Sequence, residues 1–306
     1  MVPPSFLGWM PVKTSQRMLC ELPLAPGEKT GWPWSAEAAA AAAPMPDGLP
    51  CPRISVVTPS FNQGQFLEET IRSVLLQGYP DLEYIVIDGG STDGSLGIIR
   101  EYEPWLAFRV SEKDRGQSHA INKGFARASG EIWFWLNSDD LLVPGALRHV
   151  AEIYERRPTP WITGAGYIGT SWGDPARRYL MKSPTLDELK RGKTFLQPSC
   201  YFTRELLGKV GSLLREDLHF AMDYELWCRF AAAGYFPVLT PEALSLAREH
   251  PQMKARTCSR ARYWQERGPI IRQNLGASAF FLWRGGELLR RNMRRLERRW
   301  PNVLRP

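Results

Sequence analysis

Apolar and polar residues form alternating blocks from residue 53 onward, and these blocks fit strands that alternate with helices. Four apolar runs predict buried strands, at 53–58, 82–88, about 107–111, and 131–136. Three segments between them carry apolar residues at helical spacing, at 65–77, 94–103 and 117–128. Strands that alternate with helices predict an α/β fold with a mostly parallel central sheet flanked by helices.

The second half of the chain has a less regular pattern. We expect strands near 161–169, 199–203 and 235–240, a helix at 221–233, and helical, arginine-rich sequence over most of 259–299. Residues 1–50 are rich in Pro and Gly, and Trp32-Pro33-Trp34 is the point that could attach them to the body. The chain therefore divides into an N-terminal extension (1–50), a central α/β domain (51–250) and a basic helical segment (251–306).

The net charge of +7 is distributed unevenly over the 306 residues. Residues 248–306 contain fifteen Lys or Arg and four Asp or Glu, a net of +11, which leaves −4 for the rest. A slightly acidic body is not typical of a nucleic-acid-binding domain, so we expect no nucleic-acid partner. The basic end favours an anionic surface. Its apolar run at 275–283 and arginine-rich 287–300 fit either a helix in a membrane interface or a helix packed on the body.

Three further observations concern the compartment. The sequence has no run of about 18 apolar residues, so we expect no spanning helix. Its first residues lack the charged region and apolar core of a signal peptide. The five cysteines are isolated singles, which fits a reducing environment. We expect a cytoplasmic protein, and the basic segment adds a peripheral position at the inner face of the plasma membrane as an option.

Four polar clusters each follow a predicted strand, at 58–62, 88–93, 112–117 and 137–140. Each cluster alone is compatible with a turn and a helix cap. Together they indicate a ligand site, because ligands bind at the carboxyl ends of parallel strands. Asp139 and Asp140 directly follow an apolar run, and adjacent carboxylates repel each other unless a cation joins them. Oxygen ligands suit Mg²⁺ or Mn²⁺, and Arg115 suits a phosphate or a base edge, so the sequence predicts a nucleoside diphosphate held through a divalent metal.

One motif points elsewhere. Residues Gly164–Gly169 match the dinucleotide fingerprint letter for letter. That fingerprint needs a helix directly after it, and the following Ser171–Pro175 does not suit the start of a helix. An NAD(P)-dependent oxidoreductase is therefore the weaker alternative.

The motifs in the polar clusters have a recognisable order and spacing. PRISVVTPSFNQGQFLEETIRSVLLQ, IDGGSTDGS, SEKDRGQSHAINKGFARASGEI and LNSDD closely resemble glycosyltransferase family 2, the inverting nucleotide-sugar transferases with the GT-A fold. The resemblance runs from about residue 53 to 250 and implies a GT-A catalytic domain with a Rossmann-like sheet. It implies inverting transfer of a sugar from a nucleotide diphosphate donor, with UDP-sugar favoured, to a hydroxyl of a glycan or lipid-linked acceptor. The setting it implies is cell-surface polysaccharide biosynthesis.

The resemblance also implies roles for individual residues. It places donor contacts at Pro59, Ser60, Phe61, Asp88, Asp114, Arg115, Gln117, Asn137, Ser138 and Asp139. Asn137-Ser138-Asp139 matches the Asp-X-Asp element of the family, which makes Asp139 the first candidate ligand of Mg²⁺ or Mn²⁺. Asp140 and His250 are the further metal candidates, and a lone His is equally compatible with an ordinary structural residue.

The catalytic base is expected at the start of a helix in the second half. Residues 221–227 resemble that segment of the family, and Asp223 occupies the base position, with Glu225 as the alternative. A helix-start acid that only favours the helix dipole is the competing interpretation.

Three positions depart from the family pattern. Asn137 replaces the first acid of Asp-X-Asp, Gly89 replaces a second acid after Asp88, and Met222 replaces a Glu. These departures leave the nucleotide base open, and they leave a donor-binding protein with weak or no turnover as an alternative.

Overall fold

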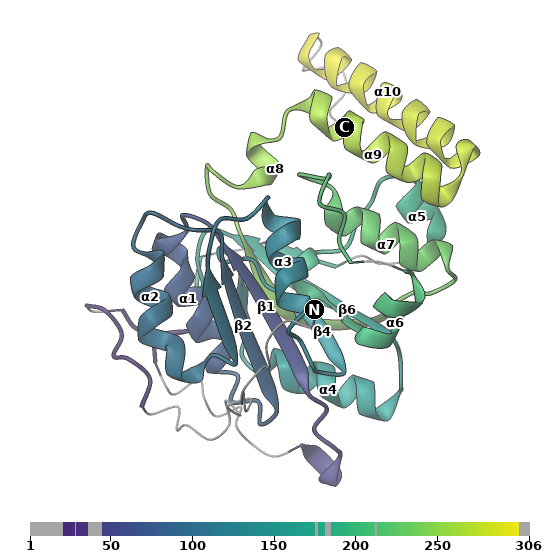
Figure 1. Ribbon diagram of the computed structural model, residues 1–306. Coiled ribbons are helices and arrows are strands. Elements are labelled where there is room, and N and C mark those ends of the chain that lie inside the picture. Colours follow the sequence, from purple (N-terminus) through teal and green to yellow (C-terminus); the bar gives the residue numbers. More distant parts are fainter. Residues whose placement is uncertain are drawn as a thin grey trace, which may run out of the picture.

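The computed structural model describes residues 21–27, 29–35, 45–174, 177–180, 185–211 and 213–299. The described residues form one sheet of nine strands in the order β3-β2-β1-β4-β8-β6-β9-β5, with β7 paired to β6 (Figure 1). The strands are β1 (Ile54–Ser60), β2 (Leu82–Asp88), β3 (Phe108–Ser111), β4 (Ile132–Trp135), β5 (Leu141–Leu142), β6 (Trp161–Gly169), β7 (Arg177–Tyr179), β8 (Cys200–Thr203) and β9 (Val238–Arg248). The α-helices are α1 (Gly64–Leu75), α2 (Ser95–Tyr102), α3 (Gln117–Phe125), α4 (Ala146–Arg156), α5 (Leu186–Lys190), α6 (Arg204–Lys209), α7 (Met222–Ala232), α8 (Lys254–Thr257), α9 (Arg260–Leu275) and α10 (Ala277–Arg299).

The first half of the sheet is parallel, as the apolar runs predict. β1 pairs in parallel with β2 and β4, and β2 pairs in parallel with β3. Alternate residues of β1 enter different cores, because successive side chains point to opposite faces of a sheet. Val57 joins the core under α3, whereas Ile54 and Val56 join the core under α1 and α2. Burial on both faces explains why these strands are apolar throughout.

The second half mixes strand directions. β8 is antiparallel to both β4 and β6, and β6 is parallel to β9. The strand expected at 235–240 is longer than predicted, because β9 continues to Arg248. Its register against β6 shifts after Thr240, where Gly164 faces Thr240 and Ala165 faces Ala243. Pro241 and Glu242, which have no partner in β6, interrupt the apolar pattern. The sequence pattern therefore does not predict that the strand continues beyond residue 240.

The dinucleotide fingerprint lies inside a strand and forms no cofactor turn. Gly164–Gly169 is the body of β6, which pairs with β7, β8 and β9. The glycines serve close packing. A methyl group at Gly164 would lie 2.6 Å from Leu244, and one at Gly166 would lie 2.3 Å from Leu196. The structure therefore contradicts the oxidoreductase alternative.

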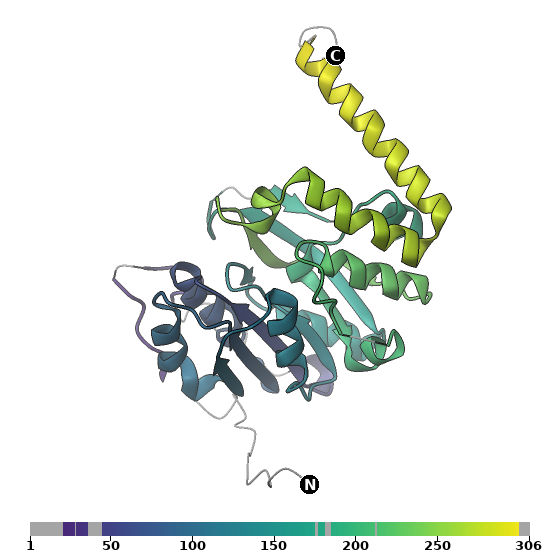
Figure 2. The ribbon, with the colours of Figure 1, turned by 45° about the horizontal axis from the view of Figure 1, so that its top comes forward.

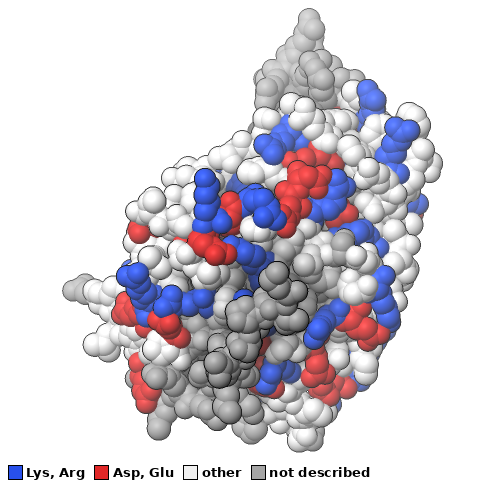
Figure 3. Space-filling view, viewed as in Figure 1, with Lys and Arg blue, Asp and Glu red and all other residues white. Residues whose placement is uncertain are grey.

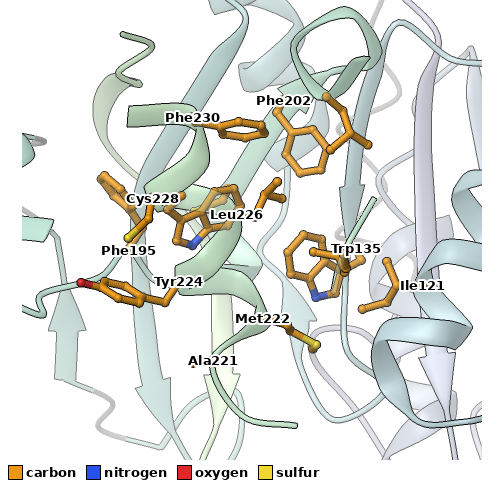
Figure 4. Close-up of a cluster of buried hydrophobic side chains, with 14 of the residues drawn as sticks. Ile121, Trp135, Phe195, Phe202, Ala221, Met222, Tyr224, Leu226, Cys228 and Phe230 are labelled. Carbon is orange, nitrogen blue, oxygen red and sulfur yellow. The ribbon is translucent and has the colours of Figure 1, made fainter. Parts of the chain in front are cut away.

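An aromatic core fixes α7 against the sheet (Figure 4). Trp227 of α7 stacks between Trp135 of β4 and Trp161 of β6, with ring centroids 5.9 and 5.3 Å apart. Phe202 and Phe230 complete the cluster with edge-on contacts. Because the core holds the middle of α7, the first turn of the helix lies at the edge of the sheet where β4 ends.

The N-terminal segment is attached as its tryptophans suggest. The indole of Trp32 donates a hydrogen bond to the carbonyl of Leu142 at 2.8 Å, and the guanidinium of Arg72 donates to the carbonyls of Pro33 and Trp34. Both Trp32 and Trp34 are buried.

Helices α9 and α10 follow the sheet in the sequence, and of the two it is α9 that lies directly against α7. α9 packs along α7, and α10 starts on α9 and then projects beyond the body (Figures 1 and 2). Within the described ranges, none of the helices combines the length and the apolar character needed to cross a bilayer.

Candidate active site

A cavity of about 520 Å³ opens where β1 and β4 end, between α3 and the start of α7. Ten residues singled out from the sequence line it: Pro59, Ser60, Phe61, Asp114, Gln117, Asn137, Ser138, Asp139, Asp140 and Asp223. The structure thus brings together side chains that the sequence separates by more than 160 residues. Asp88, Arg115 and His250 are not among the lining residues.

Phe61 stands at the mouth of the cavity with 59% of its surface exposed. The loop behind it is tied to the loop after β2, because the amide of Asn62 donates to Ser91 Oγ and Asn62 Oδ1 accepts from the amide of Thr92. Asn62 adopts a left-handed backbone, with φ of 52°, which Asn tolerates better than most residues. A flat, exposed aromatic ring on an anchored loop suits stacking against a nucleobase.

Asp88 lies beneath the site and organises a loop. Its carboxylate accepts hydrogen bonds from the amides of Gly90 and Ser91 and from the hydroxyls of Ser91 and Ser111, at 2.5 to 3.1 Å. The side chain is fully buried. Asp88 lies at the carboxyl end of β2, where the sequence predicts it. Its carboxylate oxygens, however, accept hydrogen bonds from other groups of the protein.

Asp114 explains the glycine at position 89. Its Oδ1 accepts a hydrogen bond from the amide of Gly116, and its Oδ2 lies 2.6 Å from the point where a Cβ on residue 89 would stand. A second acid after Asp88 would therefore collide with Asp114. In this chain the carboxylate at this wall comes from the loop before α3.

Arg115 points away from the cavity. Its side chain is 68% exposed and forms an ion pair of 2.5 Å with Glu216. Asn122 of α3 adds bonds to the carbonyl and amide of Leu214. The segment 213–221, which leads into α7, is thereby fastened to α3.

A chain of amides crosses the floor of the cavity. Gln117 Nε2 donates to Asn137 Oδ1 at 2.6 Å, and Asn137 Nδ2 donates to Asp140 Oδ2 and to Gln197 Oε1, each at 3.0 Å. Gln117 Oε1 accepts from the ammonium of Lys254 at 2.6 Å. Because residue 137 carries an amide, it can donate a hydrogen bond to Asp140. An ionised acid at this position, as in the family pattern, could only accept one.

Asp139 and His250 form the candidate metal centre. His250 Nε2 lies 2.9 Å from Asp139 Oδ2, although 111 residues separate them. Asp140 is oriented differently, because its oxygens accept from the backbone amide of Arg248 and from Asn137. Burial and then the neighbouring Asp139 raise the pKa of Asp140 to about 8.

The donor set at this centre fits a divalent ion. The carboxylate of Asp139 lines the cavity and meets the buried imidazole of His250. Added positive charge would stabilise the ionised form of the neighbouring Asp140, whose pKa is raised by burial. The described residues contain no cluster of three or more His, Cys, Asp or Glu side chains of metal-binding geometry. Such a pair fits Mg²⁺ or Mn²⁺ that shares its remaining positions with substrate phosphates and water.

Asp223 lies in the first turn of α7 and lines the same cavity. Burial raises the pKa of its carboxyl above the ordinary value, and the guanidinium of Arg267 in α9 opposes that shift. Arg267 is held in place by a hydrogen bond to the carbonyl of Gly192 and by stacking over Tyr224. A carboxylate with a raised pKa in a cleft is a candidate general base. Glu225, the alternative, is buried and paired with Arg229.

Sequence reasoning missed two contributors to this site. Lys254 lines the cavity, and the sequence offered only its position four residues after His250 as a signal. Glu266 of α9 accepts hydrogen bonds from the amides of His219, Phe220 and Ala221 at 2.7 to 3.2 Å and so holds the segment that leads into α7. No local pattern marks Glu266, because its role depends on α9 packing against α7.

Comparison with known proteins places these features in a family. A protein-family model described as "Glycosyl transferase family 2" matches residues 55–211. The chain is 40% identical over 191 residues to the putative teichuronic acid biosynthesis glycosyltransferase TuaG of Bacillus subtilis, covering 60% of this chain and 74% of TuaG. Against several uncharacterised bacterial glycosyltransferases the match spans less of their length, between 33% and 61%.

Solved structures show the same fold. Residues 1–349 of S. aureus TarS in complex with UDP-GlcNAc superpose with a TM-score of 0.59 at 18% identity, covering 72% of this chain and 67% of that one. The mannosyltransferase PcManGT of Pyrobaculum calidifontis, in complex with GDP-Man and Mn²⁺, gives a TM-score of 0.56 at 23% identity, covering 82% and 75%. The predicted GT-A fold is confirmed. On its motifs, its sheet and the match to the family model, the chain belongs to glycosyltransferase family 2.

Proposed function

We propose that the chain is an inverting, metal-dependent glycosyltransferase that moves a sugar from a nucleotide diphosphate donor, UDP-linked, to a hydroxyl of a glycan or lipid-linked acceptor. The observation that carries the proposal is one cavity lined by both Asp139, which is paired with His250, and Asp223. The Asp139–His250 pair suits the diphosphate end of a donor, and Asp223 suits the acceptor hydroxyl. The relationship to TuaG supports a place in cell-surface polysaccharide biosynthesis.

The donor is proposed to lie along the edge of the sheet. Phe61 offers a ring for the base, and Asp114 offers a carboxylate at the same wall, with Pro59, Ser60 and Ser138 beside them. Asp88 supports this wall from beneath, whereas Arg115 pairs with Glu216 outside the cavity lining and holds the neighbouring segment. An acceptor oxygen such as Asp114 Oδ2 suits an N–H of the base.

Charge on the diphosphate is met by Lys254, whose ammonium reaches Gln117 inside the cavity. Burial lowers the pKa of Lys254, and an anionic ligand nearby favours its charged form. A divalent ion held by Asp139 and His250, with Asp140 beside them, would neutralise charge that develops on the departing diphosphate.

Asp223 is proposed to accept the proton of the acceptor hydroxyl as that oxygen attacks the anomeric carbon. A single displacement by one base inverts the configuration at that carbon, and the nucleotide diphosphate leaves from the opposite side. The first turn of α7 lies between Trp227, which packs in the aromatic core, and Ala221, whose amide donates to Glu266. Positioning of this kind supplies much of the rate acceleration in such reactions. The proposed catalytic domain is 51–250, with Glu266 and Arg267 of the following segment as supports.

The test combines ligand-induced stabilisation with product analysis. UDP with Mn²⁺ should raise the melting temperature, and a ligand at 100 times its Kd adds about 2.7 kcal/mol. Asp139→Ala should abolish the metal-dependent part of this shift. Stabilisation by GDP instead would keep the enzyme class and correct the base. No response to any nucleotide diphosphate would overturn the proposed donor site.

Turnover separates an enzyme from a donor-binding protein. Asp223→Asn should keep the nucleotide-induced shift and lose donor hydrolysis and transfer. If the wild-type chain binds UDP with Mn²⁺ yet neither hydrolyses nor transfers any UDP-sugar, the chain is a donor-binding GT-A protein without turnover. We further propose a cytoplasmic location at the inner face of the plasma membrane, where a lipid-linked acceptor is presented.

A further inference from the structure

Helix α10 has two unlike faces at its start. Its inner face packs on α9, where Trp283 lies 4.5 Å from Trp264 between ring centroids and Ala279 is buried. Away from these contacts, Phe281 is 68% exposed, Leu282 56% and Leu288 48%. These are three of the eight large hydrophobic side chains exposed among the described residues, so the exposure is concentrated on one helix. Concentrated apolar exposure marks an interaction surface.

The helix projects from the body, so this face has room for a large partner. Figure 2 shows α10 leaving α9 near its first turns and extending away from the rest of the chain.

A groove between α9 and α10 adds cations to the apolar face. It is a cavity of about 1000 Å³ lined by Trp264, Phe280 and Leu288 together with Arg272 and Arg284. Basic side chains also follow the upper right edge of the molecule in Figure 3, where α9 and α10 lie. Aromatic and aliphatic groups beside guanidinium groups match the boundary between phosphate headgroups and acyl chains.

Charge decides between the partners that an apolar helix face could have. α10 contains seven Arg and two Glu, and residues 248–306 carry a net charge of +11. A second copy of the chain would bring two strongly basic helices together, which repulsion opposes. A bilayer with anionic lipids presents the opposite charge over an extended flat surface.

We propose that the exposed face of α10, together with the groove that it forms with α9, docks on an anionic lipid bilayer, with Phe281, Leu282 and Leu288 at the acyl boundary and Arg272 of α9 and Arg284 of α10 at the phosphates. The helix would lie in the interface, because it is amphipathic and basic. This surface is separate from the cavity that holds Asp223, so the proposal stands without the proposed glycosyl transfer. The proposal specifies which surface of the protein would contact the membrane and that the lipids it contacts would be anionic.

The test is sedimentation of the full chain with vesicles of phosphatidylglycerol and phosphatidylcholine, compared with phosphatidylcholine alone. We expect binding to the anionic vesicles only, weakened by salt. Phe281→Ser with Leu282→Ser should reduce the partition coefficient about tenfold or more, because both apolar groups lose their burial. Phe236→Ser is the matched control, since Phe236 is 40% exposed on a different part of the surface and should leave binding unchanged.

Four outcomes would overturn the proposal. They are equal binding to neutral and anionic vesicles, undiminished binding of the double variant, retention on heparin without vesicle binding, and a wild-type dimer that the double variant abolishes. Melting temperatures confirm that both variants fold. The nucleotide-induced shift should be unchanged in the double variant, so failure of the docking face and failure of the donor site are read separately.

Discussion

Gly124 sets the distance between α3 and β1, and a single methyl group added there should force the helix and the strand apart. A Cβ at this position would stand 2.3 Å from Cγ1 and 2.9 Å from Cγ2 of Val57, which is fully buried. Apolar carbons rest about 3.5 to 4.0 Å apart, so Gly124→Ala requires a local shift of roughly 1 Å. Overpacking of this kind costs about 3 kcal/mol, and the helix propensity of Ala offsets about 1 kcal/mol. We expect a net loss of about 2 kcal/mol.

A double-mutant cycle measured by urea unfolding checks this value. Val57→Ala alone should cost about 2 kcal/mol, because it leaves a small cavity. In the double variant the new methyl group fills the space of the lost Cγ atoms, so the total loss should stay near 2 kcal/mol, about 2 below the sum of the single losses.

Gly97→Ala is the matched control for this cycle. Gly97 is an exposed glycine in α2 with nothing within 4 Å of its added Cβ, and the change should raise stability by up to about 1 kcal/mol. Additive losses in the cycle, or a Gly124→Ala variant as stable as Gly97→Ala, would refute the packing argument. Because α3 begins at Gln117, the affinity for UDP should fall in Gly124→Ala and recover in the double variant.

The remaining predictions concern the supports of the cleft. Arg267→Gln removes the cation that lowers the pKa of Asp223 against the effect of burial, so this pKa should rise further. Because a base must be ionised to act, the acidic limb of the pH profile of kcat/KM should then move to higher pH. An unmoved limb would contradict the role of Asp223 as the base. Glu266→Ala leaves three amides without an acceptor and should cost about 1 to 3 kcal/mol and lower kcat more than it changes KM, whereas Glu266→Gln should restore most of kcat if positioning is its role. Lys254→Met should raise the KM for the donor about tenfold with little change in urea stability, and an unaltered KM would remove Lys254 from the donor site.

The sequence predicts the parallel half of the sheet well because each strand there is buried on both faces. The apolar run at 131–136 needs no tertiary information to be assigned, and β4 occupies most of it. β9 is the counterexample, since its bulge at Pro241 and Glu242 breaks the pattern. Two-residue β5 and three-residue β7 are too short to leave a period in the sequence.

For the site, the motif order predicts which loops meet and leaves open how side chains are oriented. Asp139 and Asp140 are adjacent acids with the same chemistry, yet one faces His250 and the other accepts from the backbone of Arg248. That difference depends on the end of β9, which lies more than 100 residues further along the chain. Glu266 escapes prediction for the same physical reason, since its three partners are 45 to 47 residues away.

The strand order has a consequence for how the protein acquires its ligand. The cavity needs Pro59 from the first strand and Lys254 from beyond the last, so it closes only when long-range contacts across the whole sheet have formed. Contacts of high sequence separation form late and slowly. A nucleotide would therefore find no site on a half-folded chain, and its binding would slow unfolding while leaving the rate of folding unchanged. A lower rate of unfolding in the presence of nucleotide would therefore indicate that β9, the last strand, has joined the sheet.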